Sequence, residues 1–336
     1  MQIEHNYLLT HHNTFRLQVK SRWFAAYDNE EELSRIVQDD FFLKKRFLSI
    51  GEGSNLLFIN DFDGVILHSC IKGIDKTDET TDSVLLQAGA GTHWDDVVAY
   101  SVSNGWSGIE NLSDIPGTAG AAAVQNIGAY GVEIKDVIDT VVTCNQLTGK
   151  KQVFSNKACQ YGYRHSFFKE PNHDPFIITS ISLRLQKNSQ FKLDYGNLST
   201  RLKRRNISLQ TVRNAVIEER RAKLPEPTVL GNAGSFFTNP VIPQKQFDDM
   251  KSLYPEMPFY PTTEGTVKIP AGWLIEKCGY KGKREGNVGV FEKQALIIVN
   301  HGGATGGEIA SFAESIERTV YDRFGVRLTP EVKYIR

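Results

Sequence analysis

The sequence has few cysteines and carries no sign of a membrane or export segment. Its 336 residues include four cysteines, which stand far apart and form neither a Cys-x-x-Cys pair nor a Cys/His cluster at metal-ligand spacing: Cys70, Cys144, Cys159 and Cys278. This spacing disfavours a zinc site and a disulfide framework, and it suits a reducing cytosol. No basic stretch followed by an apolar run marks a signal peptide, and no apolar run approaches the roughly 20 residues that span a bilayer. We therefore expect a cytoplasmic protein without a metal.

The sequence also lacks a net charge. Lys+Arg 39 and Asp+Glu 39 give a formal charge of zero, so no global field predicts a nucleic-acid or membrane partner. The basic run at 201–205 is typical of a solvated face. The length of 336 residues suggests two or three domains.

Helix and strand patterns alternate along the chain. Apolar stripes bounded by capping residues predict helices, and short apolar or alternating runs predict strands. The predicted helices cover residues 28–40 (capped by Asp28), 92–104 (capped by Thr92), 208–221 (capped by Ser208), 273–277, and 305–324, which opens on a Thr305–Glu308 capping box. The predicted strands cover residues 47–50, 56–59, 65–68, 176–185 and 295–299, with a hairpin at 137–154. A proline-containing linker at 224–227 leads to a last domain, which opens on a predicted glycine-rich loop at 231–237.

Residues 111–131 are almost all small. Four glycines and five alanines leave the backbone open, so another molecule could accept hydrogen bonds from its N–H groups. This composition is typical of a loop that cradles a phosphate-bearing cofactor. A tightly packed turn, with its alanines against a neighbouring element, explains the composition equally well.

A second small segment, Gly51-Glu52-Gly53-Ser54-Asn55, follows a predicted strand. Two glycines with Ser and Asn can form a nest of N–H groups suited to an anion. The segment is not a Rossmann fingerprint, because the third glycine of G-x-G-x-x-G is missing and no helix pattern follows directly. Gly89-Ala90-Gly91 fails the same test.

Six motifs occur in a fixed order along the chain. They are Gly51–Asn55, Ile115-Pro116-Gly117, Gln125-Asn-Ile-Gly-Ala-Tyr-Gly131, Tyr161-Gly-Tyr-Arg164, Gly231-Asn-Ala-Gly-Ser-Phe-Phe237 and Pro330-Glu-Val332. Together they resemble the UDP-N-acetylenolpyruvoylglucosamine reductase family, the flavoenzymes of bacterial peptidoglycan synthesis, from about Asn13 to Arg336. Leu193–Asn197 and the Lys223–Pro227 linker are similar to the longer type of this family, which carries a tyrosine loop over the substrate.

The resemblance implies an α+β protein with a two-domain FAD-binding fold of the vanillyl-alcohol-oxidase (PCMH) type and a third α+β substrate-binding domain. The implied parts are residues 1–70 and 71–224, which bind FAD, the second including the tyrosine loop, and residues 225–336, whose C-terminal segment returns to the active site. FAD is then bound non-covalently. Its implied contacts are Gly51, Glu52, Gly53, Ser54, Asn55, Ile115, Pro116, Gly117, Gln125, Asn126, Gly128, Ala129 and Tyr130.

The resemblance further implies that NADPH reduces FAD. The flavin N5 then delivers hydride to C3 of the enolpyruvyl group of UDP-N-acetylglucosamine enolpyruvate, and C2 is protonated to give UDP-N-acetylmuramate. Ser235 matches the proton donor, Arg164 the group that polarises the substrate carboxylate, and Glu331 a hydrogen-bonding partner near C2. Such a reaction needs a cation at the developing charge and a proton donor within hydrogen-bond reach. Without the resemblance, these side chains fit a turn serine, a surface ion pair and an exposed carboxylate.

The implied substrate contacts combine lysines, which suit a diphosphate, with tyrosines, which suit a lid. They are Tyr195, Lys223, Asn239, Tyr260, Lys281 and Gln294. We expect a monomer.

Two other functions fit parts of the pattern. One is a flavin oxidase of the same cofactor class, but many of these tether the flavin through His or Cys, and residues 111–131 contain neither. The other is a non-catalytic nucleotide-binding protein, which would leave the Ser235, Arg164 and Glu331 motifs unexplained.

Overall fold

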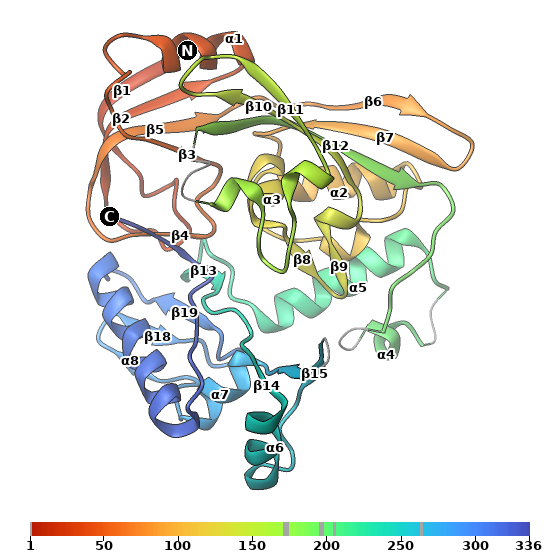
Figure 1. The fold of residues 1–336 in the computed structure, drawn as a ribbon, viewed down its shortest axis with the longest axis vertical. Helices are drawn as coiled ribbons and strands as arrows, with labels where there is room; N and C mark the ends of the chain where they lie inside the picture. Colours follow the sequence, from red (N-terminus) through yellow and green to blue (C-terminus); the bar gives the residue numbers. More distant parts are fainter. Residues whose placement is uncertain (1, 171–174, 195–197, 204–205, 263–264) are drawn as a thin grey trace. The chain divides into compact units, whose positions relative to one another are not determined.

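The computed structural model describes residues 2–170, 175–194, 198–203, 206–262 and 265–336. The chain divides into two compact units (Figure 1). Unit 1 comprises residues 1–7, 21–52 and 63–222, and unit 2 comprises residues 8–20, 53–62 and 223–336. Both units mix helices and strands, as expected for an α+β protein. Among the described residues, no helix is long and apolar enough to cross a membrane.

Unit 1 contains two larger sheets. Their orders are β1-β2-β5-β3 and β11-β10-β12-β7-β6, and β8 pairs with β9 in a short ribbon. The strands are β1 (Gln2–Leu8), β2 (Lys20–Tyr27), β3 (Phe47–Ile50), β5 (Phe62–Ser69), β6 (Ile74–Glu79), β7 (Ser83–Gly89), β8 (Gly128–Ala129), β9 (Val132–Glu133), β10 (Ile138–Asn145), β11 (Lys151–Ser155) and β12 (Phe176–Gln186). The predicted hairpin at 137–154 is confirmed as β10–β11, and the predicted strand at 176–185 as β12.

Unit 1 also contains five α-helices among the described residues. They are α1 (Glu30–Gln38), α2 (Trp94–Ser103), α3 (Ala119–Gln125), α4 (Leu198–Leu202) and α5 (Leu209–Lys223). Two predicted caps are wrong by one residue. Asn29, not Asp28, accepts the Glu32 N–H, because Asp28 lies one position earlier and donates its own N–H to the Glu32 carboxylate. His93, not Thr92, precedes α2, and it makes no side-chain cap bond.

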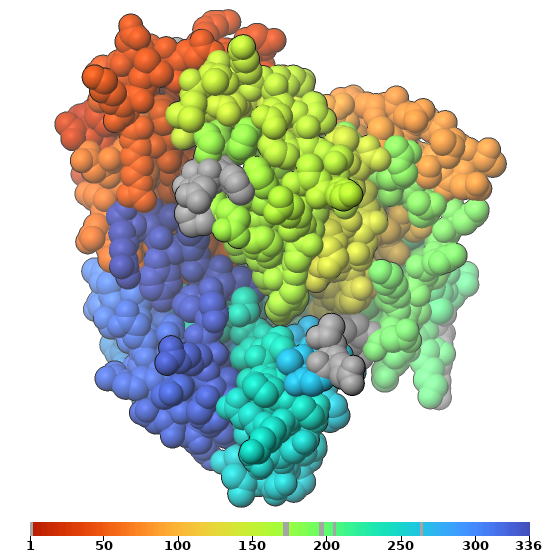
Figure 2. Space-filling view, in the orientation of Figure 1, coloured from red at the N-terminus to blue at the C-terminus, as the bar shows by residue number. Residues whose placement is uncertain are grey.

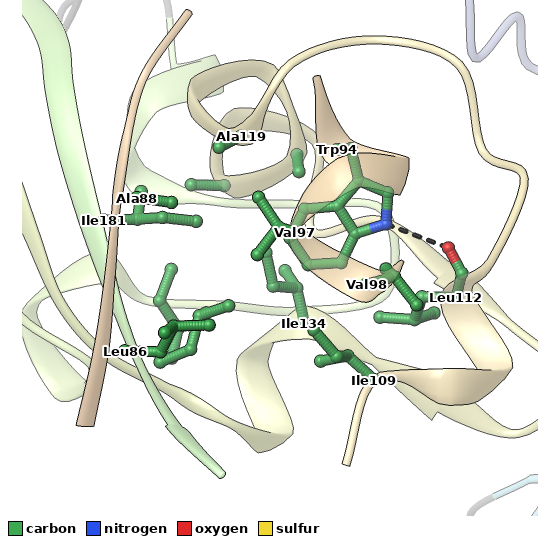
Figure 3. Close-up of a cluster of buried hydrophobic side chains, with 14 of the residues drawn as sticks. Leu86, Ala88, Trp94, Val97, Val98, Ile109, Leu112, Ala119, Ile134 and Ile181 are labelled. Carbon is green, nitrogen blue, oxygen red and sulfur yellow. Dashed lines mark hydrogen bonds between the residues drawn. The ribbon is translucent and has the colours of Figure 1, made fainter. Parts of the chain in front are cut away.

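The main core of unit 1 surrounds Trp94 (Figure 3). The Trp94 ring is 1% exposed, and its Nε1–H donates to the Leu112 carbonyl at 2.9 Å. Ala119 lies in the same cluster, which places the start of α3 against buried side chains of the sheet and of α2. The indole is amphipathic, so burial of its apolar body and satisfaction of its N–H together hold the 111–119 segment in place.

Unit 2 contains the sheet β13-β19-β18-β17, the sheet β14-β16-β15 and the parallel pair β4–β20. Its strands are β4 (Leu56–Phe58), β13 (Gly231–Ser235), β14 (Val241–Pro243), β15 (Tyr260–Pro261), β16 (Thr266–Lys268), β17 (Arg284–Glu285), β18 (Val288–Val290), β19 (Ile297–Asn300) and β20 (Lys333–Ile335). Its helices are α6 (Gln244–Leu253), α7 (Ala271–Lys277) and α8 (Gly306–Phe324). The α6 segment forms part of the teal surface in Figure 2.

Two sequence predictions for unit 2 had opposite outcomes. The Thr305–Glu308 capping box and the stop at Gly325 are confirmed for α8, where Gly325 takes the left-handed conformation at φ 63°. The predicted loop at 231–237 is wrong. Residues 231–235 form β13, whose backbone pairs with β19 across a bulge between Asn232 and Ser235. The bulge leaves Gly234 at φ 69°, which explains why a glycine-rich segment can be a strand here.

Candidate functional site

Glu52 links the 51–55 turn to the central segment within unit 1. One carboxylate oxygen accepts the Gly117 N–H at 2.7 Å, and the other contacts His93 Nδ1 at the start of α2. Gly51 approaches so closely that a Cβ there would lie 2.6 Å from Thr118 Oγ1. The turn and the Ile115–Gly117 segment, both predicted to contact the cofactor, therefore lie side by side.

The backbone of the central segment is mostly occupied by the protein itself. The Ala119 N–H donates to Thr92 O at 2.9 Å, and the Gly120 N–H donates to Ala90 O at 3.0 Å. Thr118 caps α3 by accepting the Ala121 N–H. Ala119, Ala122 and Ala123 are buried in the core. For residues 117–123, the packed-turn interpretation is thus the better description, and the N–H groups named here are not open to a ligand.

Asn126 ends α3 and joins it to the Tyr161–Arg164 motif. It is fully buried, takes the left-handed conformation at φ 43°, and donates from Nδ2 to Gly162 O at 2.7 Å and to Glu133 Oε2 at 2.9 Å. Its Oδ1 accepts the Lys135 N–H at 3.2 Å. The Asn126 side chain is therefore bound on every side by protein, and its role is to shape the loop that follows.

Arg164 lies against that loop. Its Nη2 donates to the Gly128 carbonyl at 2.9 Å, and a Cβ at residue 128 would come within 3.0 Å of Nη1. Arg164 itself has φ 53°, and its carbonyl accepts from Lys169 Nζ at 2.9 Å. Gly128 is thus required for the close approach of the guanidinium to the backbone.

One buried acceptor of the central segment has no protein partner. Asn111 is 1% exposed, and its Nδ2 donates to the carbonyls of Tyr130 and Lys192, both at 2.8 Å. Among the described residues, nothing donates to its Oδ1. A buried acceptor left over by the protein is a feature that a ligand with N–H or O–H groups satisfies. The residues present therefore fit a polar cofactor beside this segment, and Tyr130 borders it.

The remaining part of the 51–55 turn belongs to unit 2. Gly53 has φ 67°, and a Cβ there would lie 2.1 Å from His12 O, so only glycine fits. Asn55 donates from Nδ2 to Glu331 O at 3.1 Å and accepts the Lys333 N–H at 3.0 Å. β4 follows at once and pairs in parallel with β20. These bonds hold the segment that carries Glu331 beside Ser54 and Asn55.

The structure brings the Ser235 and Glu331 segments together in unit 2. The Glu331 N–H donates to the carbonyl of Phe236 at 2.8 Å, and Phe237 pairs with Pro330. Ser235 pairs with Ile297 at the end of β13. The Ser235 side chain is half-buried. A serine and a carboxylate residue far apart in sequence thus lie on adjacent backbone segments.

Asn239 and Gln294 each lie beside the first turn of α7. Asn239 Oδ1 accepts the Ala271 N–H at 2.9 Å, and Gln294 Oε1 would lie 3.1 Å from a Cβ at Gly272. One predicted substrate contact therefore caps the helix with its oxygen, which leaves its amide N–H₂ to serve another partner.

The other predicted substrate contacts are more dispersed. Lys223 ends α5 and is exposed. Lys281 pairs with Glu276 at 3.0 Å. Tyr260 lies on the separate β14-β16-β15 sheet, with Lys268 Nζ 5.6 Å from its ring centroid. Tyr195 lies outside the described residues.

The cysteines carry neutral thiols. Burial raises the pKa of Cys159 to about 11, and burial also raises the pKa values of Cys70, Cys144 and Cys278. Because a thiolate is the reactive form of cysteine, these thiols are poor nucleophiles near neutral pH. In the described part of the chain, no group of His, Cys, Asp and Glu side chains is arranged to hold a metal ion.

Sequence reasoning missed the side chains that hold the central segment. His93 and Asp95 belong to none of the six motifs, and yet His93 contacts the Glu52 carboxylate and Asp95 accepts the Asp114 N–H at 2.6 Å. No local signal reveals that partnership, because the two residues lie 19 positions apart.

Comparisons with known proteins extend over the whole chain. The model of the FAD binding domain matches residues 22–152, and that of the UDP-N-acetylenolpyruvoylglucosamine reductase C-terminal domain matches residues 226–335. The chain is 48% identical to the UDP-N-acetylenolpyruvoylglucosamine reductase of Porphyromonas gingivalis, with 100% of both chains covered. It is 45% identical to that of Bacteroides fragilis, with 99% of this chain and 100% of the relative covered.

This chain belongs to the UDP-N-acetylenolpyruvoylglucosamine reductase family. A crystal structure of a UDP-N-acetylenolpyruvylglucosamine reductase from Thermus caldophilus has the same fold, with a TM-score of 0.70, 21% identity and 100% of both chains covered. The expected FAD-binding fold is therefore confirmed. The protein is an FAD-dependent oxidoreductase of the family that serves peptidoglycan precursor synthesis.

Proposed function

We propose that this reductase uses NADPH to reduce the enolpyruvyl group of UDP-N-acetylglucosamine enolpyruvate to the lactyl ether of UDP-N-acetylmuramate, acting as a cytoplasmic monomer. FAD would be held by residues 51–55 and 115–130, and it would supply the hydride chemistry that links NADPH to C3 of the enolpyruvyl group. The observation that carries the proposal is the pairing of the Ser235 and Glu331 segments through the Glu331 N–H and the Phe236 carbonyl. Family membership supplies the substrate class.

Ser235 is the proposed donor of the proton to C2. A serine hydroxyl is a weak acid, so the developing carbanion must be stabilised before the proton moves. We assign that role to Arg164, whose guanidinium would bind the substrate carboxylate and polarise it toward the enolate. The glycine at 128 and the bond to its carbonyl fix the direction of this guanidinium. Glu331 would accept a hydrogen bond near C2 and orient the donor.

The proposed FAD contacts come from the two small segments, Gly51–Asn55 and 115–130. Within the second, the occupied N–H groups of Gly117, Ala119, Gly120 and Ala121 shift the expected polar contacts toward Asn111 and the 125–130 loop. The four neutral thiols, with raised pKa values, support non-covalent binding. For the substrate, we keep Lys223 and Lys281 as diphosphate partners, Tyr195 and Tyr260 as lid or phosphate contacts, and Asn239 and Gln294 as polar contacts near the start of α7. The three-part division at residues 70 and 224 is also kept as a prediction.

Ser235→Ala separates the two half-reactions. Reduction of the flavin by NADPH should proceed at nearly the wild-type rate, because no proton from Ser235 is needed. Reoxidation by the enolpyruvyl substrate should slow by about 100-fold or more, the usual contribution of a positioned acid. Stopped-flow absorbance of the flavin measures both rates.

Ser252→Ala is the matched control, since the Ser252 hydroxyl donates only to Asp248 O on the exposed α6. It should leave both rates unchanged. Equal slowing of the two half-reactions in Ser235→Ala would remove Ser235 as the proton donor.

A further inference from the structure

Asp114 is a strained residue at the entrance to the 115–117 segment. It has φ 60°, a left-handed conformation that costs a non-glycine residue roughly 1 kcal/mol or more. Each of its polar groups is bound. Its N–H donates to Asp95 Oδ1 at 2.6 Å, its carbonyl accepts from Arg220 Nε at 3.0 Å, and its carboxylate accepts from Arg221 Nη2 at 3.2 Å.

Asp95 is itself held by a two-point ion pair. Arg213 Nη1 and Nη2 donate to the two carboxylate oxygens of Asp95, each at 2.7 Å, and the Arg213 side chain is only 12% exposed. Burial acts to raise the pKa of the Asp95 carboxyl, but the bonds from Arg213 and from the Asp114 N–H outweigh it and hold the pKa below its usual value. Asp95 therefore stays ionised, and its bidentate geometry fixes direction as well as charge.

The three arginines come from one rigid face of α5. Arg213, Arg220 and Arg221 are spaced by seven and eight residues, which places them on the same side of the helix two turns apart. An adjoining stripe of α5, with Val212, Ala215 and Val216, is buried against Leu198 and Leu202 of α4. The helix therefore cannot rotate freely, and its arginines reach α2 and the 114–117 segment from a fixed position.

We propose that Asp95 and Arg213 are positioning residues, which hold Asp114, and with it the 115–117 segment, in the conformation that binds FAD. We name Asp95, Asp114, Arg213, Arg220 and Arg221 the α5 latch. The inference rests on the proposed placement of FAD beside residues 115–117, where the Gly117 N–H is already bound to Glu52. If the bonds of the latch are lost, Asp114 relaxes from its strained conformation. Only a fraction of the molecules then keeps the conformation that binds FAD. The apparent FAD dissociation constant then rises by the inverse of that fraction.

The test uses the full-length chain stripped of FAD and compares Arg213→Gln with wild type. Hydrogen exchange should show the Asp114 amide protected in wild type and exchanging about tenfold faster in the variant. Titration of FAD, followed by its fluorescence, should give a dissociation constant raised about tenfold, which corresponds to about 1.4 kcal/mol. Arg213→Lys keeps the charge but not the two-point geometry, and it should fall between the two.

Arg184→Gln is the matched control. Arg184 donates twice to Asp139, at 3.0 and 3.1 Å, in a half-buried pair between β10 and β12 that touches no latch residue. It should lower thermal stability to a similar extent and leave both the Asp114 exchange rate and the FAD affinity unchanged.

The possible results distinguish a failure of the latch proposal from a failure of the proposed FAD site. If the Asp114 amide of Arg213→Gln exchanges no faster than that of wild type, the latch is overturned, whatever the FAD affinity of the variant. An equal loss of FAD affinity in Arg184→Gln also overturns it, because the effect would then be one of general stability. Faster exchange of Asp114 with unchanged FAD affinity would instead contradict the placement of FAD beside residues 115–117. If Arg213→Gln does not fold, Asp95→Asn, which preserves shape, is measured in the same way.

Discussion

Two glycines show how single residues shape the site. At Gly53 a side chain would collide with the backbone of residue 12, and at Gly128 it would collide with the Arg164 guanidinium. At Gly53 a close backbone contact is combined with φ 67°, whereas a Cβ at Gly128 would lie 2.9 Å from Glu133 Cγ, 3.0 Å from Arg164 Nη1 and 3.1 Å from Val132 O. In the sequence both residues are glycines within a motif, and only the structure shows why each position requires glycine.

We expect Gly53→Ala to destabilise unit 2 strongly. The left-handed backbone alone costs about 1 kcal/mol, and the contact with His12 O, which a Cβ would approach to 2.1 Å, requires the backbone to shift. Gly279→Ala is the control, because Gly279 has φ 79° with nothing within 4 Å of its Cβ position. Urea unfolding should show a larger loss for Gly53→Ala than for Gly279→Ala. Equal losses would show that the close approach carries no cost.

At the scale of elements, local sequence signals predicted a helix or a hairpin correctly where its capping or turn residues lie within the element itself. α8 begins and ends where its capping box and its glycine indicate, and the β10–β11 hairpin follows from its turn. The prediction of a loop at 231–237 failed because strand propensity is poor there, while the pairing of β13 with β19 comes from residues about 65 positions away. Long-range pairing of this kind overrides local composition.

The central segment shows the same limit within the site. Small residues were recognised as a site for close approach, but composition does not say which molecule approaches. The structure shows that oxygen atoms of Ala90, Thr92 and Glu52 accept hydrogen bonds from three backbone N–H groups of residues 117–120. The motif residues Asn126 and Gly128 turn out to shape the loop and direct Arg164. His93, which contacts Glu52, and Asp95, which bonds to Asp114 and Arg213, belong to no motif and could not be found from sequence.

Removal of the α8 cap should have a modest and local effect. The Thr305 hydroxyl accepts the Glu308 N–H at 3.2 Å, and the Glu308 carboxylate accepts the Thr305 N–H at 2.7 Å. Thr305→Ala should therefore lower the free energy of unfolding by about 1 kcal/mol, measured by urea denaturation. Thr305→Ser retains the hydroxyl and should remain near wild type. A loss as large in Thr305→Ser as in Thr305→Ala would contradict the capping role.

At the scale of the whole molecule, the order of the chain differs from its grouping in space. Residues 8–20 and 53–62 belong with the C-terminal residues in unit 2, although they precede most of unit 1 in sequence. Strand β4 pairs with β20, nearly 280 positions later, and Asn55 bonds to Glu331. No periodicity in the sequence indicates such pairings, whereas the ordered set of family motifs identifies the flavoenzyme as a whole.

The central claim, that this reductase passes electrons from NADPH through FAD to an enolpyruvyl ether, is tested most directly by one anaerobic visible spectrum. NADPH is added to the purified protein reconstituted with FAD, followed by UDP-N-acetylglucosamine enolpyruvate. We predict that the flavin bands bleach with NADPH and return with the enolpyruvyl substrate. Bleaching without recovery would contradict the assigned substrate, and the absence of bleaching would contradict NADPH as the reductant.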